Sequence, residues 1–265
     1  MKQSVRDIEQ VSRAEKSGVD VLDRAFSILF AFRPGDESLS LTTLSARTGL
    51  YKSTVLRLAN SLIHHRFLDK LVDGHYRLGS APLTLGSVYQ SNLNLGEALL
   101  PLMRELNQAY GEAVSFHVRE GNHRVCLYRI NSRFAIRPNV RQGDVQPLER
   151  GSGGRVLLAF SGKVGAQFEE IRRNHIYVSV GERDPEMSGV AAPVFGAQQI
   201  LIGALSIVGP VNRLGRPELE SLRGPLLNTA ARATDQLGGD PAGLLAAATA
   251  TIDARSPRKS KKQSS

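Results

Sequence analysis

Residues 41–60, LTTLSARTGLYKSTVLRLAN, limit the possible fold more than any other stretch of the chain. Their pattern predicts two short helices separated by a sharp turn. Thr42 can cap the first helix, because its hydroxyl can accept a hydrogen bond from a backbone N–H that the helix leaves unpaired. Gly49 stands where the chain must leave that helix in a left-handed conformation. Ser53 or Thr54 then begins the second helix.

The second predicted helix has two chemically different faces. Apolar residues recur at helical spacing and are expected to face a core: Val55, Leu58, Ala59 and Leu62. The opposite face carries cations, hydroxyls and an amide but no carboxylate: Lys52, Ser53, Thr54, Arg57, Asn60, Ser61 and His64. Cations bind phosphate oxygens, and side-chain donors and acceptors read base edges. The stretch therefore predicts a helix–turn–helix that binds DNA. An ordinary corner of two helices is the alternative.

Residues 67–79 extend this motif, because their alternating polarity predicts a β-hairpin with a two-residue turn at Asp73-Gly74. Helix, turn, helix and hairpin in this order form a winged helix–turn–helix. Donors on the wing would lie near phosphate, although Arg77 could equally be a solvated strand residue. The expected DNA contacts are Thr42, Thr43, Arg47, Lys52, Ser53, Thr54, Arg57, Asn60, Ser61, Lys70 and Arg77.

Composition narrows the class of protein. The 265 residues suggest one or two domains, and the net charge of +9 suits a polyanionic partner. The single Cys126 excludes an intrachain disulfide and a Cys-rich zinc site, and is typical of a reducing compartment. No signal peptide is recognised, and the longest apolar runs are too short to span a bilayer. We therefore expect a cytoplasmic protein without a membrane partner.

The rest of the chain predicts a second kind of domain. Helices are expected over residues 19–32, 80–94 and 95–110. The hydrophobic period then changes to two, which predicts an antiparallel sheet with strands over 113–119, 125–131, 136–141, 176–180, 190–195 and 200–208. Helices over 152–160, 164–174 and 216–237 would surround it. This arrangement is an α+β sensor fold.

A second chemical signal lies in residues 147–159, PLERGSGGRVLLA. Gly151, Ser152, Gly153 and Gly154 precede and begin a predicted helix. Small residues there would let a ligand approach backbone N–H groups, and the helix dipole favours an anion. The spacing is not that of a Walker loop. A plain strand–helix turn is the alternative.

The order of these motifs resembles the IclR family of bacterial transcription regulators. The resemblance runs through DVLDRAFSILFAF, LSLTTLSARTGLYKSTVLRLANSL and GHYRLG, and departs from the family at Tyr51, where a Pro is usual. It implies a winged helix–turn–helix domain over 19–80. Over 81–240 it implies a linker helix, which also takes part in dimer contacts, and a GAF-like effector-binding domain. A flexible arm over 1–18 and a disordered basic tail over 241–265 would complete the chain.

The resemblance also implies that the second domain binds a small carboxylic acid. Ser206 matches a pocket serine on the last strand, Ser179 falls where some members have an Asp, and Gly189 falls where many have a Cys. Val208 replaces a second serine of some members, so we expect a less polar, roomier pocket for an aromatic or longer acid. The expected effector contacts are Gly151, Ser152, Gly153, Gly154, Ser179, Gly189 and Ser206.

Together these patterns predict a sequence-specific DNA-binding regulator of a catabolic operon. Its partners would be a double-stranded operator, an organic acid that controls operator affinity, and itself as a homodimer or dimer of dimers. No cofactor, metal site or catalytic residue is expected. Ser152 stands in GSGG rather than in a nucleophile elbow, and His117 and His123 have no suitably spaced carboxylate. An enzyme, or a ligand sensor in which DNA binding is secondary, is the alternative.

Overall fold

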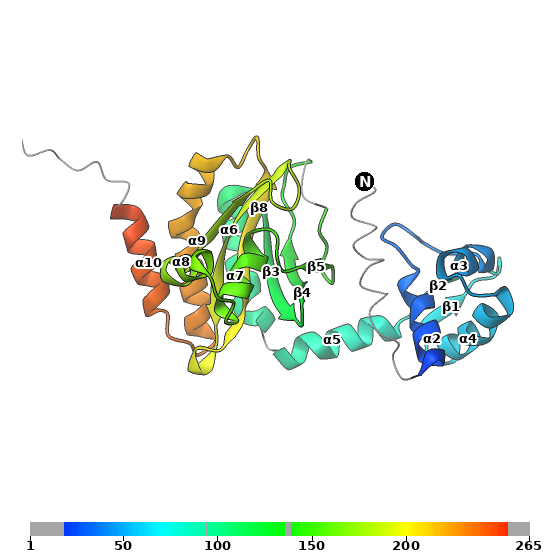
Figure 1. Cartoon of the computed structure of the whole chain (residues 1–265). Helices are drawn as coiled ribbons and strands as arrows, with labels where there is room; N and C mark the ends of the chain where they lie inside the picture. Colours follow the sequence, from blue (N-terminus) through cyan, green and yellow to red (C-terminus); the bar gives the residue numbers. More distant parts are fainter. Residues whose placement is uncertain (1–18, 94, 136–138, 254–265) are drawn as a thin grey trace, which may run out of the picture. The chain divides into compact units, whose positions relative to one another are not determined.

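The computed structural model describes residues 19–93, 95–135 and 139–253 (Figure 1). Contacts divide the chain into two compact units, Met1–Asn94 and Leu95–Ser265. The linker helix α5 (Ala81–Leu93) groups with the first unit, whereas the sequence placed it with the second. The predicted flexible arm lies outside the described residues.

The first unit has the helices and hairpin of a winged helix–turn–helix. Its elements are α2 (Asp20–Phe30), α3 (Leu41–Thr48), α4 (Lys52–His64), β1 (Leu68–Lys70) and β2 (Tyr76–Leu78). The apolar faces of the three helices and the hairpin share one core, which includes Ile28, Leu44 and Val55. Leu39 and Tyr76 exchange two backbone hydrogen bonds of 2.7 and 2.8 Å. The loop before α3 is thereby fixed to the wing.

The turn chemistry differs in detail from the prediction. Ser40, not Thr42, caps α3, because its Oγ accepts a hydrogen bond of 3.1 Å from the backbone N–H of Thr43. Thr42 therefore lies inside the helix. Gly49 ends α3 with a φ of 71°, as predicted, and α4 already begins at Lys52.

The wing turn is longer than the predicted two residues. The backbone N–H of Leu71 donates to the carbonyl of His75 at 2.8 Å. The N–H of Gly74 donates to the carbonyl of Leu71 at 3.0 Å. Asp73 also accepts a hydrogen bond from the N–H of His75 at 2.9 Å. This side-chain bond stabilises the wider loop.

The second unit is built on a six-stranded antiparallel sheet with the order β5-β4-β3-β8-β7-β6. The strands are β3 (Ala113–Glu120), β4 (His123–Ile130), β5 (Val145–Pro147), β6 (Tyr177–Val180), β7 (Met187–Phe195) and β8 (Leu201–Pro210). A 3-10 turn, η1 (Ala197–Gln199), joins the last two strands. The predicted α+β fold is confirmed.

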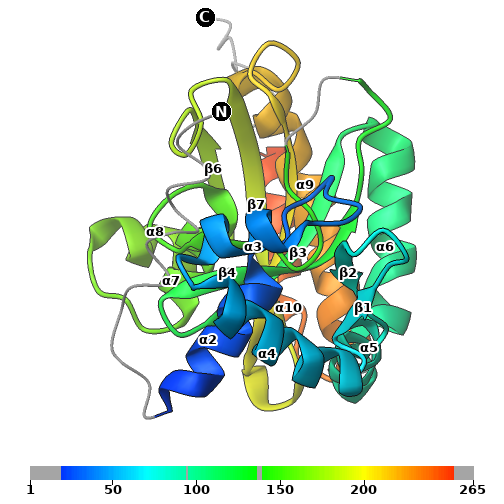
Figure 2. The ribbon, with the colours of Figure 1, turned by 90° about the vertical axis from the view of Figure 1, so that its right-hand side faces the viewer.

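Helices cover both faces of this sheet (Figure 2). One face is packed by α6 (Leu95–Tyr110) and α9 (Arg216–Gln236). The other is packed by α7 (Ser152–Phe160), against which α8 (Ala166–Asn174) lies. No helix among the described residues is long and apolar enough to cross a membrane.

Two predicted segments differ from the structure. Residues 139–141 are not a strand, and the rest of that predicted strand, residues 136–138, lies outside the described residues. The disordered tail is wrong over 242–253, which form α10 (Ala242–Asp253). This helix packs on α9 and buries Leu244 and Ala248. Its Ala-rich sequence has high helix propensity, which outweighs its lack of amphipathic pattern. Residues 254–265 lie outside the described chain.

Candidate functional site

The predicted recognition helix α4 separates its two faces as expected. Val55 and Ala59 are fully buried in the core of the first unit. The predicted DNA contacts Lys52, Ser53, Arg57, Asn60 and Ser61 are all exposed, and Thr54 is partly exposed. The same surface also carries the exposed Leu56, as well as Tyr51, whose side chain is 85% exposed just before the helix. Sequence reasoning counted neither as a contact.

Arg47, one of the predicted DNA contacts, has partners within the first unit. Its guanidinium forms an ion pair with Asp36 and donates a hydrogen bond of 2.9 Å to the Ala31 carbonyl. The pKa of Asp36 is lowered, chiefly by its hydrogen bond with Arg47. This side chain holds the loop after α2 against α3, so Arg47 supports the fold and is not carried into the DNA contacts proposed below.

The remaining predicted contacts lie on exposed or partly exposed surface. Arg77 pairs with Asp69 across the wing at 3.1 Å, and Lys70 lies over the Tyr76 ring at 5.9 Å. Both cations are exposed. Thr42 is exposed on α3, whereas the Thr43 hydroxyl lies 2.9 Å from Ser40 Oγ. An exposed pair such as Arg77–Asp69 adds little to stability and leaves the cation accessible.

The second unit contains a cavity of about 500 Å³, part of it open to solvent. It lies where the start of α7 meets the sheet. Six of the seven predicted effector residues line it: Gly151, Ser152, Gly153, Ser179, Gly189 and Ser206. Val208, expected in place of a second serine, lines it too. Residues that were not predicted line it as well: Ser115, His117, Arg124, Arg129, Val140, Gln146, Glu182, Arg183, Asp184, Met187 and Ser188.

The glycines at the start of α7 make room for an arginine. A Cβ added at Gly153 or Gly154 would lie 3.2 Å from Arg124 Nη1, and one at Gly151 would lie 3.5 Å from Nη2. At Gly154 it would also lie 2.2 Å from the Leu148 carbonyl oxygen, which is closer than any real contact. The small residues were interpreted as space for a ligand. In the structure, these small residues allow the Arg124 side chain to lie close to the start of α7. Gly154 does not line the cavity.

Two backbone N–H groups at the start of α7 remain open. The N–H of Gly151 donates to Glu182 Oε2 at 3.2 Å, and that of Ser152 donates to Ser179 Oγ at 3.0 Å. The N–H groups of Gly153 and Gly154 have no hydrogen-bond acceptor among the described residues. They are available to an anion, which the positive end of the helix dipole also favours.

Arg124 is the main electrostatic feature of the cavity. Its side chain is buried, with 4% of the residue exposed, and its guanidinium has no hydrogen bond or ion pair to another described residue. Burial, and secondarily the charge of Arg183, lower the pKa of Arg124 to about 10. A buried cation beside the positive end of a helix is costly without a counterion. The charges around the cavity therefore favour an anion electrostatically.

A β-bulge in β4 gives the cavity its cations. Phe116 pairs with Tyr128 and His117 pairs with Cys126, so β4 has one extra residue, Leu127. Arg124 and Arg129 are five positions apart and would point to opposite faces of a regular strand. The bulge turns both toward the cavity, which is a common role of bulges next to functional sites.

His117, for which no catalytic role was predicted, lies in β3 and lines the cavity. It is 5% exposed, and neither of its ring nitrogens has a partner among the described residues. The pKa of His117 lies well below its ordinary value because of burial and, in second place, the charges of Arg124, Arg183 and Arg129. The imidazole is therefore neutral near pH 7 and offers one donor and one acceptor.

The cavity carries charged side chains that the sequence did not assign to it. Arg129 donates from Nη1 to Ser115 Oγ at 2.8 Å, and Arg183 is exposed at the rim. Glu182 is engaged with the hydroxyl of Tyr177 at 2.6 Å and with the N–H of Gly151. Arg124, Arg129 and Arg183 thus line the cavity. The carboxylate of Glu182 already accepts hydrogen bonds from other groups of the protein.

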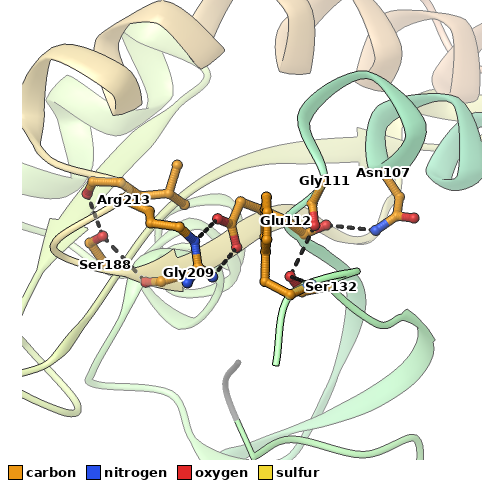
Figure 3. Close-up of polar contacts among 9 residues, drawn as sticks. Asn107, Gly111, Glu112, Ser132, Ser188, Gly209 and Arg213 are labelled. Carbon is orange, nitrogen blue, oxygen red and sulfur yellow. Dashed lines mark hydrogen bonds and ion pairs between the residues drawn. The ribbon is translucent and has the colours of Figure 1, made fainter. Parts of the chain in front are cut away.

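Beside the cavity, a network of polar contacts fixes the ends of β3, β7 and β8 (Figure 3). Glu112 is buried and accepts two hydrogen bonds from Arg213, at 2.6 and 3.1 Å. Ser188, which lines the cavity, donates to the Leu214 carbonyl at 2.5 Å. Arg213 also lies over the Phe134 ring at 4.5 Å. These contacts hold one wall of the cavity in place.

Known protein families match the sequence of both units. The model of the IclR helix-turn-helix domain matches residues 21–71, and that of the bacterial transcriptional regulator IclR C-terminal domain matches 87–167 and 163–235. The HTH-type transcriptional regulator KipR of Bacillus subtilis is 25% identical over 248 residues, covering 84% of this chain and 98% of that protein. The glycerol operon regulatory protein of Streptomyces griseus is 25% identical over 229 residues, covering 76% and 90%.

Solved structures show the same fold. An IclR homolog from Microbacterium hydrocarbonoxydans, complexed with 4-hydroxybenzoate, aligns with a TM-score of 0.70 and 22% identity over 82% of this chain and 99% of that chain. The IclR of Thermotoga maritima aligns with a TM-score of 0.68 and 18% identity over 83% and 99%. With both units matched by family models, this chain belongs to the IclR family of bacterial transcription regulators and is a DNA-binding regulator rather than an enzyme.

Proposed function

We propose that this regulator changes its affinity for operator DNA when a small carboxylic acid binds in the cavity of the second unit. The observation that carries the proposal is the buried guanidinium of Arg124, which has no counterion among the described residues. A carboxylate can accept two parallel hydrogen bonds from such a group. It can also accept from the open N–H groups of Gly153 and Gly154.

The structural neighbour that holds 4-hydroxybenzoate supports a carboxylic acid as the class of ligand. A relative in Streptomyces griseus is named for the glycerol operon, which supports a catabolic operon as the target.

On the DNA side, α4 would enter the major groove with its exposed polar face, and the wing would lie along phosphates. The proposed contacts are Thr42, Thr43, Lys52, Ser53, Thr54, Arg57, Asn60, Ser61, Lys70 and Arg77. One such helix reads only a few base pairs, so we propose at least a homodimer on a partly palindromic site. Exposed apolar side chains on α5, among them Leu83, Leu85 and Val88, support a self-contact there.

A thermal-shift screen of organic acids tests the ligand. Each acid is paired with its uncharged amide, because a carboxylate held by Arg124 should raise the melting temperature and the amide should not. The matched variants are Arg124→Met and Arg119→Met. Arg119 lies opposite Arg124 in the strand register but is exposed.

The proposal predicts that the shift disappears in Arg124→Met and persists in Arg119→Met. An acid that stabilises the Arg124→Met protein as well as the wild type would contradict Arg124 as the anchor. If no acid stabilises the wild type, the proposed effector class is wrong.

A further inference from the structure

The described side chains that line the cavity include two with buried nitrogens that lack any partner, Arg124 and His117. A carboxylate accounts for Arg124 but leaves His117 unexplained. An unpaired polar group in a protein interior is costly, and such groups are rare. The neutral imidazole of His117 therefore indicates a second polar group on the ligand.

Geometry places this second group near the carboxylate. A Cβ at Gly153 would lie 3.2 Å from Arg124 Nη1 and 3.6 Å from His117 Nδ1. The two nitrogens thus flank the same residue at the start of α7. A carboxylate bound to Arg124 and to the open N–H groups would carry its neighbouring carbon close to the imidazole.

Three serines that line the cavity are already bonded within the protein. Ser206 Oγ donates to the Ser115 carbonyl at 3.2 Å, and Ser115 Oγ accepts from Arg129 at 2.8 Å. Ser179 Oγ accepts from the N–H of Ser152 at 3.0 Å. These bonds leave His117 with both ring nitrogens available to the ligand.

We propose that His117 is a specificity-determining residue that binds a hydroxyl on the carbon next to the ligand carboxylate, so that the cavity selects 2-hydroxy acids. This rests on the proposed function, in which Arg124 anchors the carboxylate. A hydroxyl suits a neutral imidazole, because it can donate to the ring nitrogen that lacks a proton or accept from the one that has it. The acid without the hydroxyl leaves His117 unpaired and should bind about 10- to 100-fold more weakly.

The test is calorimetry on the full chain with pairs of acids that differ only in this hydroxyl: lactate and propionate, malate and succinate, mandelate and phenylacetate. The variants are His117→Leu, which removes both polar nitrogens, and His123→Leu, a control at the hairpin turn outside the cavity. His117→Ala replaces His117→Leu if the latter does not fold. Circular dichroism checks that each variant is folded.

In the wild type and in His123→Leu, the 2-hydroxy member of a binding pair should bind about 10- to 100-fold more tightly than its partner. In the His117 variant the two members should bind within about 2-fold of each other, with the affinity for the plain acid little changed.

Equal affinities for both members in the wild type overturn the role of His117 and leave the proposed function standing. A preference that survives in the His117 variant overturns it too. If all six acids fail to bind the wild type, 2-hydroxy-acid selection is overturned, and the broader acid screen on Arg124→Met decides separately whether the proposed function holds.

Discussion

The two units present cations to anions in opposite ways. On α4, Lys52 and Arg57 are exposed, and water solvates them in the absence of DNA. In the cavity, Arg124 is buried beside the positive end of α7 without a counterion. Exposed cations affect the folded state little, whereas a buried unpaired cation destabilises it until an anion binds. Substitutions on α4 should therefore change binding alone, and substitutions around Arg124 should change stability and binding together.

The largest expected effect is a loss of folding stability at Gly154, where the start of α7 is most closely packed. Gly154→Ala would place a Cβ 2.2 Å from the Leu148 carbonyl oxygen and 3.2 Å from Arg124 Nη1. The backbone must shift, so we expect the free energy of unfolding to fall by about 3 kcal/mol. Urea unfolding measures it. Gly86→Ala, on α5 with open space around it, is the control and should be neutral or slightly stabilising. Equal stability of the two variants would refute the close packing at α7.

Arg57→Ala should affect DNA binding without affecting the fold. Arg57 is exposed on the proposed groove-facing side of α4, and a bidentate contact to guanine contributes about 1–3 kcal/mol. Gel-shift titration should show an operator affinity roughly 5- to 150-fold weaker, with an unchanged circular dichroism spectrum. Arg24→Ala, an exposed cation on α2, is the control. Wild-type affinity in Arg57→Ala would exclude this helix from the groove.

Arg47 and Arg124 offer the sharpest contrast in stability. Arg47→Met removes the partner of Asp36 and a hydrogen bond to Ala31, so the melting temperature should fall, by an amount equivalent to about 1–2 kcal/mol. Arg124→Met removes an unpaired buried charge, so the melting temperature of the ligand-free protein should rise. Calorimetric scans compare the melting temperatures of the two variants with that of the wild type. A fall in both variants would mean that Arg124 has a counterion after all.

The smallest expected effect is the contribution of His117 to the pH dependence of folding stability. Because the pKa of His117 is lowered in the folded state, the unfolded chain binds a proton more readily below about pH 6.5. Stability should therefore be unaffected above that pH and should fall below it, by up to about 1.4 kcal/mol per pH unit. Urea unfolding at pH 7.5 and 5.5 should show a smaller difference for His117→Leu than for the wild type. Identical differences would mean that the pKa of His117 is the same in the folded and the unfolded protein.

The first unit was predictable because its signals are local. Helical spacing separated the buried Val55 and Ala59 from the exposed Arg57, and Gly49 marked the turn. The cap of α3 and the wing turn were mispredicted although their hydrogen bonds, at Ser40 and Asp73, are local. The structural contacts of Arg47, in contrast, are distant in sequence. Arg47 bonds to Asp36 and Ala31, 11 and 16 residues away, and no spacing rule reports that.

The cavity was only half predictable. Its glycines and serines were identified, but Arg124 and His117 were missed. Strand alternation alone cannot show a bulge, and the bulge at Leu127 decides which β4 side chains face the cavity. One signal was present: Arg124 stands two residues before Cys126 and four before Tyr128, so a cation begins a run of otherwise apolar alternate positions. A charged residue in such a run indicates a buried functional group.

The most direct test of the account is operator affinity measured with and without the acid that the thermal screen selects, in the wild type and in Arg124→Met. Coupling requires that the acid prefer one arrangement of the regulator over another. The account predicts that a saturating acid changes the operator dissociation constant of the wild type by roughly 5- to 150-fold and leaves that of Arg124→Met unchanged. An equal change in both proteins, or no change in the wild type although the acid binds, would contradict it.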